Sequence, residues 1–188
     1  MILTKLAPGQ RDDIALAVDL VNTWDVMADP PEVLRGVDQL RRLLTWHGHT
    51  EAAAAATEAD VRRARSLGTG LRQAFDAADE AEAVRVLNEV VREAGTVPQL
   101  VRDDGRWRLR HGPPETTPAF LAPATALALL GVILRDGWDR FGVCAASPCC
   151  CVYVDRSRTR SRRYCCHYCA DRVNQARYRR RRTRTGQV

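Results

Sequence analysis

The chain has 188 residues, a net charge of +6 and 45% apolar residues, which suits one medium domain or one domain with a small appendage. No run reaches the roughly 18 to 20 apolar residues that would span a bilayer, and no signal peptide is evident, so we expect a soluble cytoplasmic protein. The charge is unevenly distributed along the chain. Residues 139–188 hold thirteen arginines against three aspartates, or +10, whereas residues 1–138 carry −4.

Apolar spacing predicts helices over residues 14–24 and 38–48. The first helix places polar residues among apolar ones. Asp19, Asn22 and Trp24 are therefore candidates for binding a small-molecule ligand, although capping and satisfying a helix end explains the polar pair more simply.

A long helix is expected after the capping sequence Thr57-Glu-Ala-Asp60, into which the alanine run before it should flow. Gly68 and Gly70 either weaken this helix or allow a neighbour to pack closely. Another helix is expected over residues 80–94.

Residues 98–102 and 106–110 predict a β-hairpin around the turn Asp103-Asp104-Gly105. Residues 118–141 predict one long helix, apolar on nearly all sides and hence central to the core. We therefore predict a mainly α fold: a helical domain over residues 1–141 with one small hairpin, followed by a small zinc-finger module over residues 142–188.

All seven cysteines lie between Cys144 and Cys169, an odd number in a short window, which favours a metal site in a reducing compartment over a disulfide framework. Small zinc modules usually bind one structural zinc ion with two pairs of cysteines that are separated by a loop. The preferred ligands are Cys144, Cys149, Cys165 and Cys169.

Two choices within this tetrad stay open. Cys166 can replace Cys165, and Cys150 or Cys151 can replace Cys149. His167 stands between candidate ligands and is more simply an exposed neighbour.

The basic segment around the second cysteine pair predicts a nucleic-acid surface, because arginine forks onto phosphate or guanine and asparagine can pair with adenine. A helix from Ala170 onward would carry much of it. The predicted contact residues are Arg156, Arg158, Arg160, Arg162, Arg163, Arg172, Asn174, Arg177, Arg179, Arg180 and Arg181.

The segment from Asp155 to Cys165 resembles the bacterial CGNR zinc fingers, whose pattern is Asp-x-Ser-Arg-x-x-Ser-Arg-Arg-aromatic-Cys. Cys169-Ala-Asp-Arg172 stands where Cys-Gly-Asn-Arg is expected, with Gly and Asn replaced. The run from Leu16 to Thr23 looks like the opening of the ABATE domain that precedes this finger. The resemblance implies a stress-response transcription regulator associated with the bacterial nucleoid.

Together these patterns predict a zinc-dependent DNA-binding regulator whose helical domain senses a small-molecule effector or mediates assembly, for example as a homodimer. An RNA-binding protein using the same surface and an iron–sulfur redox sensor are the alternatives. We expect no enzyme, because no catalytic constellation stands out and four thiolates leave zinc no open position.

Overall fold

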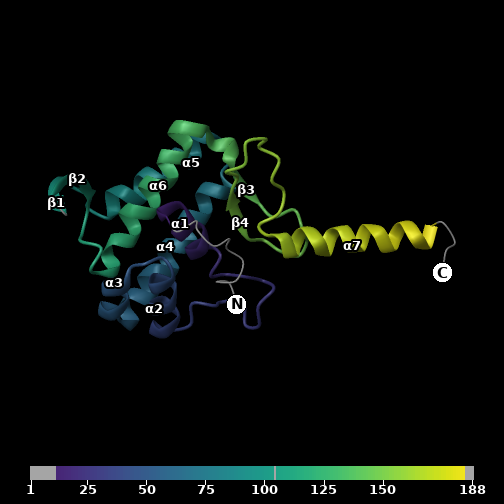
Figure 1. Cartoon of the computed structure of the whole chain (residues 1–188), viewed down its shortest axis with the longest axis horizontal. Helices are drawn as coiled ribbons and strands as arrows, with labels where there is room; N and C mark the ends of the chain where they lie inside the picture. The colour runs from purple at the N-terminus through teal and green to yellow at the C-terminus, as the bar shows by residue number, and fades with distance from the viewer. Residues whose placement is uncertain (1–11, 104, 185–188) are drawn as a thin grey trace.

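The computed structural model describes residues 12–103 and 105–184. Most of these residues are helical, so the predicted mainly α fold is confirmed (Figure 1). The helices are α1 (Asp13–Val21), α2 (Val37–Trp46), α3 (Thr50–Ala55), α4 (Glu58–Asp76), α5 (Glu80–Glu93), α6 (Leu121–Asp136) and α7 (His167–Arg184). Two short 3-10 helices, η2 (Pro118–Phe120) and η3 (Trp138–Arg140), flank α6.

Two small antiparallel sheets accompany the helices. Strands β1 (Pro98–Asp103) and β2 (Arg106–His111) form the predicted hairpin, although Asp104 of its turn lies outside the described residues. Strands β3 (Phe141–Val143) and β4 (Val152–Val154) form the second sheet.

Helix α1 lies in the centre of the helical part and contacts both α4 and α6. The Asp12 side chain caps it by accepting a hydrogen bond from the Ala15 N–H, and Leu16 and Leu20 are fully buried. A Cβ atom on Gly68 of α4 would lie only 2.8 Å from the Leu20 carbonyl oxygen. Glycine is therefore what allows α1 and α4 to cross so closely, whereas a Cβ on Gly70 would meet nothing closer than 4.0 Å.

The start of α4 follows the sequence closely, since Thr57 and Asp60 form a reciprocal capping box. We had expected the alanine run to flow into this capping sequence, but the run does not continue into α4. It forms the separate helix α3, because Ala56 and Thr57 adopt extended backbone angles that break the helix.

The single helix expected over residues 118–141 is wrong at its C-terminal end. Gly137 has a φ of +90°, which ends α6 at Asp136, and the chain then turns through η3 into β3. The stretch Pro118–Asp136 is long and apolar enough to cross a membrane by length and composition, contrary to the sequence-based expectation. In the structure it packs on α1 and α5, with Ala126 and Leu129 fully buried, as a core helix does.

Strand β4 ties the C-terminal module to the helical part. Val152 and Val154 belong to the same buried cluster as the leucines of α1, and β4 contacts α1 directly. Helix α7 extends away from this body in Figure 1 and, at about 1.5 Å per residue, is about 27 Å long. It begins at His167, three residues before the predicted start.

Candidate metal centre and arginine-rich helix

Four cysteine side chains converge in the C-terminal module. The sulfur atoms of Cys144, Cys149, Cys165 and Cys169 all lie within 4.8 Å of one another, and all four residues are buried. The Cys165 Sγ lies 3.7 Å from both the Cys149 Sγ and the Cys169 Sγ. A tetrahedron with Zn–S bonds of about 2.3 Å has edges of about 3.8 Å. The donor set thus fits one structural zinc ion, with no open position for a substrate.

The first pair of cysteines is shaped by the β3–β4 sheet. The Cys144 N–H donates to the Cys151 carbonyl (2.9 Å), and the Cys149 N–H closes a tight turn onto the Ala146 carbonyl (2.8 Å). Gly142 of β3 leaves room for the ring of Tyr153, which would lie only 2.5 Å from a Cβ atom at that position. These contacts shape the turn from which the Cys144 and Cys149 sulfur atoms converge on the second pair.

The second pair comes from the start of α7. Cys165 precedes the helix, and Cys169 lies in its first turn, so the metal centre fixes the point from which α7 leaves the module. Val173, one turn further along, packs against the cysteine cluster. The basic helix therefore starts as a rigid extension of the cysteine core.

The remaining thiols lie close to this centre. The Cys166 Sγ is 3.8 Å from the Cys165 Sγ and is buried, Cys151 is also buried, and Cys150 is half-buried. His167 is exposed. The four converging residues are those of the preferred tetrad.

The thiols differ in their electrostatic surroundings. Burial alone would raise the pKa of Cys144, but backbone hydrogen bonds from Cys165 and Ala146 outweigh it and hold that pKa below its ordinary value. Burial and the nearby thiols Cys151 and Cys144 raise the pKa of Cys149. A dication would offset the repulsion that four clustered thiolates exert on one another.

Some of the arginines predicted to contact nucleic acid make hydrogen bonds within the module. The Arg162 guanidinium donates to the carbonyls of Tyr164, Val154 and Cys165 and lies 4.9 Å from the centre of the Tyr153 ring. The buried Asp155 carboxylate accepts the backbone N–H groups of Ser157 and Arg162, both at 2.8 Å. The Ser157 side chain and these N–H groups overcome the effect of burial and lower the pKa of Asp155.

Arg172 has a similar role in α7. Its guanidinium donates to the carbonyls of Ala146 (2.7 Å) and Ser147 (2.8 Å), in the turn between Cys144 and Cys149. This side chain connects the helix that carries the second cysteine pair to the turn that carries the first.

Two loop arginines pair with acids near the helical part. Arg156 lies 2.6 Å from the Asp12 carboxylate at the start of α1, and Arg160 lies 2.7 Å from the Asp139 carboxylate in η3. These partly exposed pairs orient the loop and contribute little to stability. The other predicted contact residues are exposed on the loop or on α7: Arg158, Arg163, Asn174, Arg177, Arg179, Arg180 and Arg181.

The module is also hydrogen-bonded to the helical part through side chains that the sequence did not single out for this purpose. The Asn22 amide donates to the Val152 carbonyl (3.0 Å) and accepts the Val152 N–H (2.7 Å), so that it pairs with β4 as another strand would. Arg72 of α4 donates to the Cys150 carbonyl (2.5 Å). Neither contact leaves a signal in the sequence, because the partners are 130 and 78 residues apart.

The three candidate ligand-binding residues separate in the structure. The buried Asp19 carboxylate lies 2.9 Å from Nε2 of the buried His47, and burial raises the pKa of Asp19 although His47 opposes this. Asn22 bonds to β4, as described above. Trp24 is 55% exposed and lines a cavity of about 290 Å³ beside α4.

Comparison with known protein families agrees with this architecture. The ABATE family model, described as a putative stress-induced transcription regulator, matches residues 15–139, and the CGNR zinc-finger model matches residues 140–182. The chain belongs to the ABATE family. Its C-terminal module is a CGNR zinc finger, and the four clustered thiols give that finger one structural zinc site.

A curated relative of a different kind covers part of this ABATE-family chain. The 4-diphosphocytidyl-2-C-methyl-D-erythritol kinases of two Bifidobacterium longum strains are each 31% identical over 118 residues. The match takes in 53% of this chain and 37% of each kinase, so the chain spans just over a third of these relatives. This partial similarity does not establish catalysis, and both family models that match are regulatory or zinc-finger families.

Proposed function

We propose that this chain is a zinc-dependent transcription regulator that binds DNA through its finger. In this proposal Cys144, Cys149, Cys165 and Cys169 are the zinc ligands, and the finger domain spans residues 142–188. The helical domain, residues 1–141, senses a small molecule or mediates assembly such as a homodimer. The protein acts in the bacterial cytoplasm, at the nucleoid.

The observation that carries the proposal is the attachment of an exposed, arginine-rich helix to a closed cysteine centre. Cys169 and Arg172 bind the first turns of α7 to the finger, while Asn174 and Arg177 are exposed beyond that contact. A helix is about as wide as the major groove, and arginine and asparagine side chains read guanine and adenine there. The structure therefore offers a rigid basic rod of suitable width.

The exposed loop arginines add to this surface. Arg158 and Arg163 are exposed in the loop that precedes α7, a segment that Asp155 and Arg162 hold in place. We assign these two residues and Arg177 to phosphate contacts. By contrast, Arg162 and Arg172 have structural roles and influence DNA binding through the fold of the finger.

A salt titration with matched variants tests the proposal. Binding of the full chain to a mixture of genomic duplex fragments is measured by fluorescence anisotropy from 50 to 300 mM salt. Each phosphate contact contributes about −0.9 to the slope of log K against log salt. Replacing Arg158, Arg163 and Arg177 by Gln should make that slope shallower by about 2.7.

The control variant makes the same change in charge on the helical domain. Arg42, Arg62 and Arg85 are exposed on α2, α4 and α5, and replacing them by Gln should leave the slope unchanged. Equal slopes for the two triple variants would overturn the assignment of the DNA surface, and absence of duplex binding by the wild-type chain would overturn the function.

RNA is the second candidate, because Tyr168 and Tyr178 of α7 are 60% and 61% exposed and aromatic rings stack on unpaired bases. Competition between duplex DNA and single-stranded RNA for the wild-type chain separates the two functions. The iron–sulfur alternative is disfavoured, because four sulfur atoms within 4.8 Å of one another leave room for one ion rather than for a cluster of several iron and sulfide ions.

A further inference from the structure

A cavity of about 290 Å³ lies between the end of α1, the segment that follows it, and one face of α4. At about 30 Å³ for each water, it has room for about ten water-sized groups, the size of a small organic molecule. Its lining combines an aromatic ring, two arginines, two threonines and one acid. The lining residues are Val21, Thr23, Trp24, Glu32, Arg65, Gly68, Thr69 and Arg72.

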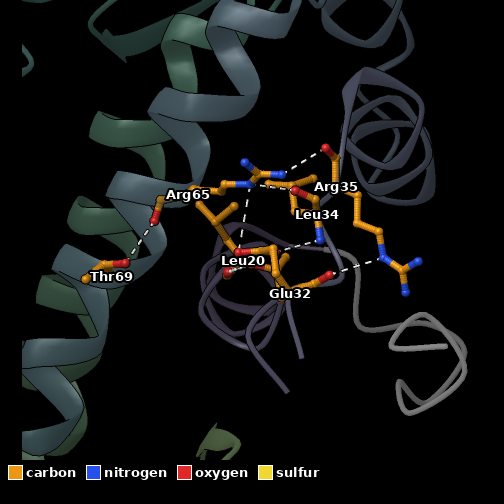
Figure 2. A network of polar contacts seen from close by, with 7 residues as sticks. Leu20, Glu32, Leu34, Arg35, Arg65 and Thr69 are labelled. Atoms are coloured by element: carbon orange, nitrogen blue, oxygen red, sulfur yellow. Dashed lines mark hydrogen bonds and ion pairs between the residues drawn. The ribbon is translucent and has the colours of Figure 1, made fainter. Parts of the chain in front are cut away.

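Arg65 of α4 is held rigidly at this cavity (Figure 2). Its Nε donates to the Leu34 carbonyl (2.7 Å), and its Nη2 donates to the Arg35 carbonyl (2.8 Å). The Glu32 carboxylate is 3.8 Å away and is itself occupied by the Leu34 N–H. Within the described residues the Nη1 atom of Arg65 has no hydrogen-bond partner, so a fixed guanidinium keeps donors available at the cavity.

Trp24 provides an apolar surface beside this charge. Its backbone is fixed by a β-bridge to Glu32, yet its side chain is 55% exposed. An indole ring offers a flat face on which another planar ring stacks. A partner for this ring would be aromatic.

The charge of the lining favours an anion. Arg65 and Arg72 contribute two positive charges against one negative charge from Glu32, although Arg72 also pairs with Asp76. The hydroxyl groups of Thr23 and Thr69 already donate to helix carbonyls, so they present acceptor lone pairs to the cavity rather than donors. Hydrogen-bond donation to a ligand therefore falls to the guanidinium of Arg65.

We propose that this cavity binds a small monocyclic aromatic carboxylate, with its carboxylate on Arg65 and its ring against Trp24. The forked guanidinium matches the two oxygens of a carboxylate, and the second arginine adds favourable charge. The inference deepens the sensing role proposed for the helical domain, and it names the ligand class and the residues that bind it.

The cavity also has a direct connection to the finger. Arg72 lines the cavity and donates through Nη1 to the carbonyl of Cys150, which follows the zinc ligand proposed at position 149. A ligand carboxylate that attracts the Arg72 guanidinium competes with this hydrogen bond. The proposed binding site therefore lies next to the turn that carries the first cysteine pair.

The test follows the indole N–H signals of the ¹⁵N-labelled, zinc-loaded full chain by NMR while benzoate is added, without DNA. The chain has four tryptophans, and loss of one signal in Trp24→Phe and of another in Trp107→Phe assigns the two that matter. We expect the Trp24 signal to move saturably and the Trp107 signal to stay in place, since Trp107 lies on the exposed hairpin.

Three further probes define the chemical class. Benzamide has the ring without the charge, acetate has the charge without the ring, and inorganic phosphate is an anion of another shape. The proposal expects each of them to bind at least tenfold more weakly than benzoate. Equal binding of benzamide or acetate, saturation by phosphate alone, or an unmoved Trp24 signal would overturn it.

Calorimetry with two variants makes the assignment specific. Replacing Arg65 by Gln or Trp24 by Leu should each weaken benzoate at least tenfold, whereas Trp107→Leu should bind as the wild type does. Trp24→Leu alters an exposed side chain and keeps the test valid if Arg65→Gln does not fold. Since DNA is absent, failure here leaves DNA binding unaffected, and failure to bind DNA leaves the cavity test intact.

Discussion

Asn22→Ala tests whether Asn22 joins the helical domain to the zinc finger. The Asn22 side chain is the partner of both the N–H and the carbonyl of Val152, and Val152 is fully buried. The substitution deletes the amide and leaves these two backbone groups without partners.

The expected loss of stability follows from those two groups. A buried backbone group that loses its hydrogen bond costs about 1–3 kcal/mol, and the costs of two adjacent groups are not fully additive. We therefore expect Asn22→Ala to lower the free energy of unfolding by about 2–4 kcal/mol. For a chain of this size that corresponds to roughly 6–12 °C in Tm.

Urea unfolding followed by far-UV circular dichroism measures this loss, with zinc present throughout. Asn88→Ala makes the same substitution at an exposed site in α5, so its stability should change by no more than about 0.5 kcal/mol. A loss below about 0.5 kcal/mol for Asn22→Ala, or equal losses for both variants, would refute the structural role of the Asn22–Val152 pair.

Three further predictions concern the helix crossing, the finger clamp and the metal. Gly68→Ala should destabilise the chain by about 1–2 kcal/mol despite the better helix propensity of alanine, because the new Cβ meets the Leu20 carbonyl. Gly70→Ala should stabilise the chain by up to about 1 kcal/mol. Urea unfolding of both variants checks this, and a stabilised Gly68→Ala would contradict it. Arg172→Ala should weaken zinc binding about tenfold or more in a competition with a coloured chelator, whereas Arg177→Ala, which alters an exposed side chain of the same helix, should not. Removing zinc with a chelator should abolish the hydrogen-exchange protection of residues 144–182 and leave the protection of α4 and α5 in place. Uniform loss of protection across the chain would show that the finger is not a separate unit of stability.

Local signals in the sequence predicted much of this fold. The capping box at Thr57 and Asp60 marked the start of α4, and the alternation around Trp107 marked the hairpin. The cysteine spacing also predicted the four thiols that converge. Each of these features depends on residues that are close in sequence or on a donor set with a fixed geometry.

Features that depend on an unusual backbone conformation, or on which groups a side chain meets in the folded chain, were harder to predict. The end of α6 depends on the left-handed conformation of Gly137, a residue that a helix can also accommodate. In the sequence, Asn22 looks like a polar residue at the end of a helix, and only the folded chain brings it next to Val152. Arg162 and Arg172 contribute to the basic charge of the finger, yet both donate hydrogen bonds to backbone carbonyls in the folded chain.

The coordination of zinc by the four converging thiolates is tested most directly by zinc X-ray absorption. The measurement compares the wild-type chain with a variant in which Cys150, Cys151 and Cys166 are replaced by alanine. We predict four sulfur neighbours at about 2.3 Å in both proteins, because Cys144, Cys149, Cys165 and Cys169 remain. Fewer than four sulfur neighbours in the variant, or a nitrogen or oxygen neighbour in the wild type, would contradict the proposed coordination.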